Sequence, residues 1–94
     1  MNATVKPDVV LYTTSWCPYC ERARALFRAK GVDFREIDVE AAPGARAEMR
    51  ARSGRTSVPQ VFVGDRHLGG CDDTLALDAA GELDPLLAGT AGTP

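Results

Sequence analysis

The sequence predicts a single α/β domain in which helices flank a four-stranded mixed sheet. The chain has 94 residues, enough for one hydrophobic core and too few for two. In its first half, short runs of β-branched and aromatic residues alternate with segments of helical spacing. In its second half, two short apolar runs flank a Gly-Asp turn and precede a last helical segment. We expect one domain over residues 1–94, with its core at about 8–88 and a frayed tail at 89–94.

The first two elements are a strand followed by a helix. Residues 8–13, DVVLYT, are a short β-branched and aromatic run that is typical of a buried strand. A helix is expected from Pro18 to Lys30, because proline suits the first helical position and Leu26 and Phe27 fall at helical spacing. Gly31 follows as a helix stop.

A second strand and a second helix come next. Residues 32–39 alternate apolar and charged side chains, which indicates a strand. An alanine- and arginine-rich helix is expected from about Pro43 to Arg52, ending at Gly54. Because a crossover helix separates the first two strands, we expect them to pair in parallel.

The last elements are a hairpin and a helix. Two short strands, Gln60 to Val63 and Arg66 to Leu68, are joined by the Gly64-Asp65 turn. The final helix is expected to begin near Asp72 or Asp73, after two consecutive glycines. The side chains expected in the core include Leu26, Phe27, Phe34 and Phe62.

Composition excludes several classes of protein and partner. A formal net charge of −2 gives no reason to expect nucleic acid as a partner. The N-terminal segment lacks the apolar core of a signal peptide, and no later window approaches the length of a membrane helix. Three cysteines are too few, and odd in number, for a secreted disulfide framework. We therefore expect a cytoplasmic monomer with no membrane partner.

Two of the cysteines, in the segment SWCPYC, lie where the first strand meets the first helix. Cys17 and Cys20 alone are compatible with a structural staple, half of a metal site or a redox centre. A thiolate is the reactive form, and a sulfur at a helix start lies among unpaired N–H groups at the positive end of the helix dipole. We predict Cys17 to be the exposed nucleophile and Cys20, one turn deeper on the same face, to be its resolving partner.

A metal site is the main alternative from the residues themselves. His67 and Cys71 have the spacing H-x₃-C, a half-site that would complete a Cys₃His zinc set with the first pair. Against zinc, the first pair lies in a strand-to-helix turn, and a complete αβα segment separates the two halves. His67 is otherwise expected to be a solvent-exposed strand residue without a role, and Cys71 a small packing residue.

Three segments together resemble the dithiol glutaredoxins, of the small bacterial glutaredoxin 3 type. They are YTTSWCPYC at 12–20, SVPQVFV at 57–63 and GGCDD at 69–73, and the likeness extends from about Val9 to Leu87. The resemblance implies a thioredoxin-like fold and a redox-active Cys17–Cys20 disulfide. It implies an enzyme that reduces protein–glutathione mixed disulfides, protein disulfides and low-molecular-weight disulfides, with glutathione as electron donor and co-substrate and no metal.

The resemblance also implies a set of glutathione contacts. Val58-Pro59 matches the family's cis-proline turn, whose backbone pairs with the extended tripeptide. Near the last helix, N–H groups would bind the γ-glutamyl carboxylate and an aspartate its ammonium group. The residues implied to bind glutathione are Tyr19, Arg46, Val58, Pro59, Cys71, Asp72 and Asp73.

Two positions depart from the family pattern. Thr14 stands three residues before Cys17, where the family often has a lysine that supports the thiolate and the glycyl carboxylate. Trp16 is similar to the tryptophan that precedes the first cysteine in thioredoxins. The alternative functions are a thioredoxin-like or mycoredoxin-like electron donor, and a zinc or iron–sulfur binding module.

Overall fold

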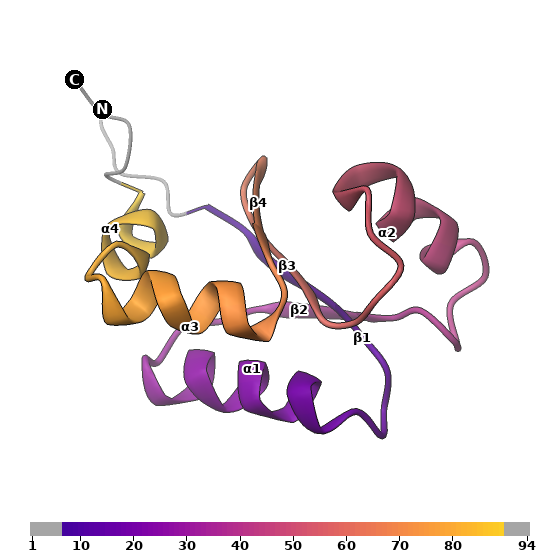
Figure 1. The fold of residues 1–94 in the computed structure, drawn as a ribbon, viewed down its shortest axis with the longest axis horizontal. Helices are drawn as coiled ribbons and strands as arrows, with labels where there is room; N and C mark the ends of the chain where they lie inside the picture. Colours follow the sequence, from indigo (N-terminus) through magenta and orange to yellow (C-terminus); the bar gives the residue numbers. More distant parts are fainter. Residues whose placement is uncertain (1–6, 90–94) are drawn as a thin grey trace.

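The computed structural model of the chain describes residues 7–89 (Figure 1). Within this range the order of elements is β1 (Val9–Thr13), α1 (Pro18–Ala29), β2 (Arg35–Asp38), α2 (Ala45–Ser53), β3 (Gln60–Val63), β4 (Arg66–Gly69), α3 (Cys71–Ala79) and α4 (Leu83–Ala88).

The strands form one mixed sheet in the order β2-β1-β3-β4. β1 and β2 are parallel and are connected through α1, whereas β1 pairs with β3, and β3 with β4, in antiparallel fashion. The predicted four-stranded mixed sheet, with a parallel first pair and a hairpin at the end, is confirmed.

Strand β1 is fully buried, because it has a neighbouring strand on each side and helices cover both faces of the sheet (Figure 1). All five of its residues are buried. Successive side chains of a strand point to opposite faces, so Val9 and Leu11 pack into one core while Val10 and Tyr12 pack into the other. The chain therefore leaves β1 from the middle of the molecule, and the cysteine segment follows directly.

Two apolar cores lie on the two faces of the sheet. Helices α1, α3 and α4 lie on one side of the sheet and α2 on the other (Figure 1). The larger core holds Val9, Leu11, Ala23, Phe27, Val61, Val63, Leu68, Leu83, Leu86 and Leu87. The smaller core, under α2, holds Val10, Tyr12, Val39, Ala45, Met49 and Phe62.

Some element boundaries differ from the prediction. β2 begins at Arg35 and not at residue 32, because Val32 and Phe34 turn toward the larger core before the strand pairs with β1. α3 begins at Cys71, immediately after the glycine pair. Of the predicted core side chains, Phe27 and Phe62 are buried, and Leu26 and Phe34 pack against the core from partly buried positions.

Helix α4 was not predicted from the sequence as a separate element. Pro85 stands at its third residue, within the first turn, where the backbone N–H groups have no intrahelical partner in any case. Leu83, Leu86 and Leu87, at helical spacing, are the buried side chains of α4 and close the larger core.

The C-terminal tail predicted at 89–94 lies outside the described residues apart from Gly89, which follows α4. The helices within residues 7–89 are all too short or too polar to cross a membrane.

The role of α4 in closing the core is testable with a leucine pair. Leu83 is 0% exposed, so we expect Leu83→Ala to lower the free energy of unfolding by about 2–5 kcal/mol, since it leaves a cavity. The matched control is Leu75→Ala in α3, where the side chain is 39% exposed and a change within about 1 kcal/mol is expected. Urea unfolding measures both. Equal losses in the two variants would show that α4 does not complete the core.

Candidate active site

The cysteine pair lies at the junction of β1 and α1. Cys17 is the N-cap residue of α1, and Pro18 occupies the first helical position. Both thiols are free; Cys17 is 9% exposed and Cys20 is 0% exposed. The prediction of an exposed Cys17 is therefore wrong in degree, because the loop at Val58 lies over it, with the Val58 carbonyl oxygen 3.9 Å from the Cys17 Sγ. Cys17 is nevertheless the more accessible of the two thiols.

The inner thiol, Cys20, is held in its protonated form. Its pKa is raised to about 11, chiefly by burial, because a thiolate there would lose its water, and in part by the neighbouring Cys17 thiol. A hydrogen bond from the Thr14 backbone and the positive charge of Arg24 act in the opposite direction. The two cysteines thus carry the same thiol group in two different environments.

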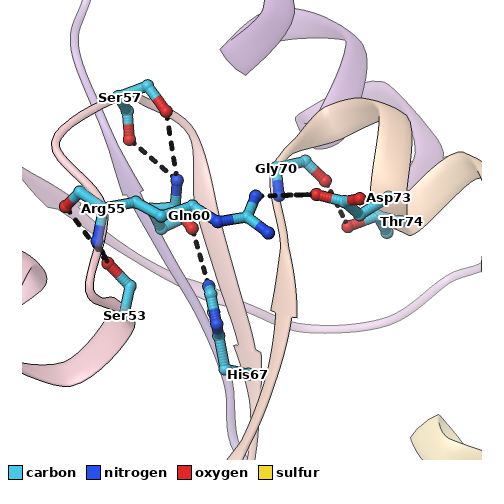
Figure 2. A network of polar contacts seen from close by, with 8 residues as sticks. All are labelled: Ser53, Arg55, Ser57, Gln60, His67, Gly70, Asp73 and Thr74. Carbon is cyan, nitrogen blue, oxygen red and sulfur yellow. Dashed lines mark hydrogen bonds and ion pairs between the residues drawn. The ribbon is translucent and has the colours of Figure 1, made fainter.

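The segment that faces Cys17 contains a cis peptide bond between Val58 and Pro59, as the resemblance implies. The next residue, Gln60, is 0% exposed and anchors this segment from inside the sheet (Figure 2). Its amide nitrogen donates to the Ser57 carbonyl at 3.0 Å and to the Ser57 hydroxyl at 3.3 Å. Its amide oxygen lies 2.7 Å from the His67 Nε2.

His67 differs from its prediction as a solvent-exposed residue. It is partly buried, its ring stacks on Phe62 at 4.8 Å between centroids, and its Nε2 contacts Gln60. Burial lowers the pKa of the His67 imidazole, and the nearby Arg55 lowers it further. Because the Gln60 amide nitrogen already donates to Ser57, its oxygen accepts the His67 N–H.

The start of α3 carries a preformed polar cluster, in which Arg55 points across to Asp73 (Figure 2). The Asp73 carboxylate accepts the Gly70 N–H at 2.9 Å and pairs with the Arg55 guanidinium at 2.9 Å. These two donors, the backbone N–H first, lower the pKa of Asp73. Asp72, the neighbouring candidate, has an exposed side chain.

Arg46 and Trp16 are brought together by a residue that the sequence analysis did not single out. Glu40 accepts the Trp16 indole N–H at 3.2 Å and lies 3.8 Å from the Arg46 guanidinium. Arg46 also lies 3.5 Å from the Thr56 carbonyl, next to the cis-proline segment. Trp16 is 72% exposed, so its indole ring lies open to solvent immediately before Cys17 in the chain.

The remaining predicted positions differ in exposure. Tyr19 is 52% exposed, with the Arg22 guanidinium 5.5 Å from its ring centroid. Cys71 is 4% exposed, and burial raises its pKa, consistent with a packing role for its side chain. Thr14 is 2% exposed, so it does not offer a polar group to solvent where the family often has a lysine.

The cysteines and the histidine do not assemble into a Cys₃His site. In the part of the chain that the structure describes, no three His, Cys, Asp or Glu side chains are placed to hold a metal ion. His67 is engaged with Gln60 and Phe62, and Cys71 is buried at the start of α3.

Besides Glu40, sequence reasoning missed three residues that shape the site, namely Gln60, Arg55 and Arg24. Gln60 had a usable signal, since it is a polar residue at the start of an otherwise apolar strand. Arg24 falls four residues after Cys20 and is therefore on the buried side of α1. Arg55 has no local signal, because its partner Asp73 is 18 residues away in sequence.

The chain matches known proteins along most of its length. The family model described as Glutaredoxin matches residues 9–68. Glutaredoxin 3 of Escherichia coli K12 is 55% identical over 80 residues, which are 85% of this chain and 96% of that protein. A solution structure of glutaredoxin from Brucella melitensis has a TM-score of 0.78 at 54% identity, and covers 89% of this chain and 91% of that one. A crystal structure of a buckwheat glutaredoxin–glutathione complex has a TM-score of 0.80 at 30% identity, and covers 86% and 76%.

The fold and the paired thiols, together with these relatives, define an enzyme of the thiol–disulfide oxidoreductase class with a thioredoxin-like architecture. Within that class, the chain belongs to the glutaredoxin family.

The close approach of Gly69 to the polar cluster generates a stability prediction. Gly69 has φ +107° and a Cβ there would overlap the Asp73 carboxylate, whereas Gly81 has φ +76° and open space around it. We expect Gly81→Ala to cost about 1–2 kcal/mol of unfolding free energy for backbone conformation alone. Gly69→Ala should cost clearly more, because Asp73 must also move. Chemical denaturation compares the two, and an equal loss would contradict the packing described for Asp73.

The pairing of Asp73 predicts a pH dependence. Its pKa is lowered in the folded state, so it contributes stability above its unfolded-state pKa and loses that contribution as the pH falls through the folded-state pKa. Asp73→Asn should therefore destabilise the protein at neutral pH, and the difference from wild type should shrink below about pH 4, near the ordinary Asp pKa. Thermal unfolding across the pH range measures this. A difference that is independent of pH would contradict the ion pair.

Proposed function

We propose that Cys17 is the nucleophile, that Cys20 is the resolving thiol, and that glutathione supplies the electrons. The observation that carries the proposal is the different setting of the two thiols. Cys17 keeps some solvent access beside the cis-proline segment, while Cys20 is fully buried on the same helix and is held protonated.

The first route uses Cys17 alone. The Cys17 thiolate attacks the glutathione sulfur of a protein–glutathione mixed disulfide, the S–S bond breaks, and the client leaves as a thiolate that takes up a proton. A free glutathione thiolate then attacks the glutathione sulfur on Cys17. That step releases glutathione disulfide and returns Cys17 to its reduced form.

The second route needs both cysteines and serves protein disulfides and low-molecular-weight disulfides. Cys17 first forms a mixed disulfide with the client, and Cys20 then attacks the Cys17 sulfur, which releases the client thiol and leaves a Cys17–Cys20 disulfide. Part of the rise in the Cys20 pKa comes from the free Cys17 thiol. That part disappears once Cys17 is in a mixed disulfide, so Cys20 becomes easier to deprotonate when its attack is needed.

Glutathione is proposed to lie on the surface between the cis-proline segment, the start of α3 and Arg46. The N–H of Gly70 is already bonded to Asp73, so the N–H groups of Cys71 and Asp72 remain for the γ-glutamyl carboxylate. The ammonium group would lie between the carboxylates of Asp72 and Asp73.

The rest of the tripeptide would contact the cis-proline segment and the opposite wall. The Val58 backbone would pair with its extended part beside Pro59, with Tyr19 flanking it. The Arg46 guanidinium would take the glycyl carboxylate. The glutathione complex of the buckwheat relative supports glutathione as the ligand.

The partners are proposed to be glutathionylated and disulfide-containing proteins, reduced by a monomer in the cytoplasm. Three cysteines, too few and odd in number for a secreted disulfide framework, support a compartment that keeps thiols reduced.

Serine variants of the two cysteines separate the two routes. Cys20→Ser should retain reduction of a glutathione mixed disulfide within about threefold and lose reduction of a protein disulfide, because the first route needs no resolving thiol. Cys17→Ser should lower both by at least about a hundredfold, since no nucleophile remains. A glutathione-coupled assay with the two substrates measures this.

Cys71→Ser is the matched control and should retain both activities, because only the backbone of that residue is assigned a role. Loss of both activities in Cys20→Ser would contradict the assigned roles. Turnover with thioredoxin reductase and none with glutathione would favour the thioredoxin-like alternative.

A further inference from the structure

Arg24 is a buried cation beneath the active-site loop. Its side chain is only 11% exposed, although arginine is usually a surface residue. It lies on α1 four residues after Cys20, on the same side of the helix. The guanidinium donates to Glu21 at 3.0 Å, to Glu36 at 2.5 Å and to the Thr14 carbonyl at 3.1 Å.

The three contacts fix Arg24 from three segments of the chain. Glu36 comes from β2 and is itself held by the Thr13 hydroxyl at 3.0 Å. Glu21 comes from the preceding turn of α1, and Thr14 is the first residue after β1. A guanidinium suits this position because its planar fork supplies several donors in fixed directions.

The Thr14 peptide links Arg24 to the resolving thiol. Its carbonyl accepts a hydrogen bond from the Arg24 guanidinium, and a hydrogen bond from the Thr14 backbone lowers the pKa of Cys20. The Thr14 hydroxyl is buried and has no hydrogen-bond partner among the described residues, so this side chain contributes no charge and no visible contact. In place of the lysine that the family often has at this position, a positive charge acts on Cys20 from inside the fold, from Arg24.

The groups that act on Cys20 are few. They are the Cys17 thiol, the Thr14 backbone and the Arg24 guanidinium. Arg24 is paired with two carboxylates, of which Glu36 is 32% exposed and Glu21 is 62% exposed and so more screened by solvent. Because water is excluded around Cys20, a fixed positive charge has a larger effect there than at the surface.

We propose that Arg24 is a positioning residue for the resolving thiol: it fixes the Thr14 peptide against Cys20, and its charge favours the Cys20 thiolate during attack on a Cys17 mixed disulfide. The proposal rests on the roles given to the two cysteines under the proposed function. In this step the Cys20 proton passes to water, the Cys20–Cys17 S–S bond forms, and the Cys17–client bond breaks. The electron pair of that bond leaves with the client sulfur, which becomes a thiol.

The resolving step can be measured without glutathione. The reduced chain is mixed with one equivalent of a dithiobis-nitrobenzoate reagent, which releases one coloured thiolate when Cys17 attacks and a second when Cys20 resolves the mixed disulfide. Cys20→Ser lacks the second phase and so identifies it. The pH profile of the second phase reports the titration of Cys20 while Cys17 is blocked.

Four variants give the expected pattern. Arg24→Gln keeps a donor for the Thr14 carbonyl without the charge. It should move the midpoint of the second-phase pH profile to higher pH and slow the second phase at pH 7 by about threefold to tenfold. Arg24→Lys keeps the charge and should restore most of the rate. Glu36→Gln removes an offsetting negative charge and should move the midpoint downward. The matched control is Arg28→Gln on the same helix, where the side chain is 60% exposed and pairs with Glu21, and it should match wild type.

The results that would overturn the proposal are equally definite. They are an unchanged midpoint in Arg24→Gln, an equal shift in Arg28→Gln, or equal slowing of both phases, which would indicate only a general loss of structure. If Arg24→Gln does not fold, Glu36→Gln decides, because an upward or absent shift there contradicts the electrostatic role. Failure of the chain to use glutathione would leave this assay readable, so the two proposals fail separately.

Discussion

The burial of strand β1 is the constraint on which the rest of the structure depends. β1 is paired on both edges and packed on both faces, so its position is set by the whole domain. The chain leaves it directly into the segment that carries Cys17 and enters α1 at Pro18. The Cys17 sulfur thus follows closely on a strand that is held on both edges and both faces, and the Val58 carbonyl that contacts it comes from the segment just before β3.

The two thiols have different surroundings because they lie three residues apart along the start of α1. Over that distance the chain passes from the N-cap position, where solvent is still accessible, to a fully buried turn of α1. At the inner position, burial raises the pKa of the Cys20 thiol. The Thr14 peptide, directly after β1, is linked to two of these groups: its carbonyl accepts from Arg24, and a hydrogen bond from its backbone lowers the pKa of Cys20.

The sequence was sufficient for features that depend on local pattern. The strands, the helix starting at Pro18 and the terminal hairpin were all predictable from periodicity and from proline and glycine positions. α4 was missed because Pro85 interrupts a short segment, although its leucine spacing was present. The contacts of Arg24 and Arg55 were not predictable, since each depends on partners brought together by the sheet. The degree of burial of Cys17 likewise depends on a loop about 40 residues away.

The cluster at the start of α3 has a consequence for how a ligand would bind. Asp73 is already held by the Gly70 N–H and by Arg55, and the cis-proline segment is held by Gln60. These groups lose their rotational freedom when the chain folds, so a ligand that binds beside them does not have to order them. Because the conformational entropy of these side chains is already lost on folding, binding does not have to reduce it again, and more of the contact energy contributes to affinity.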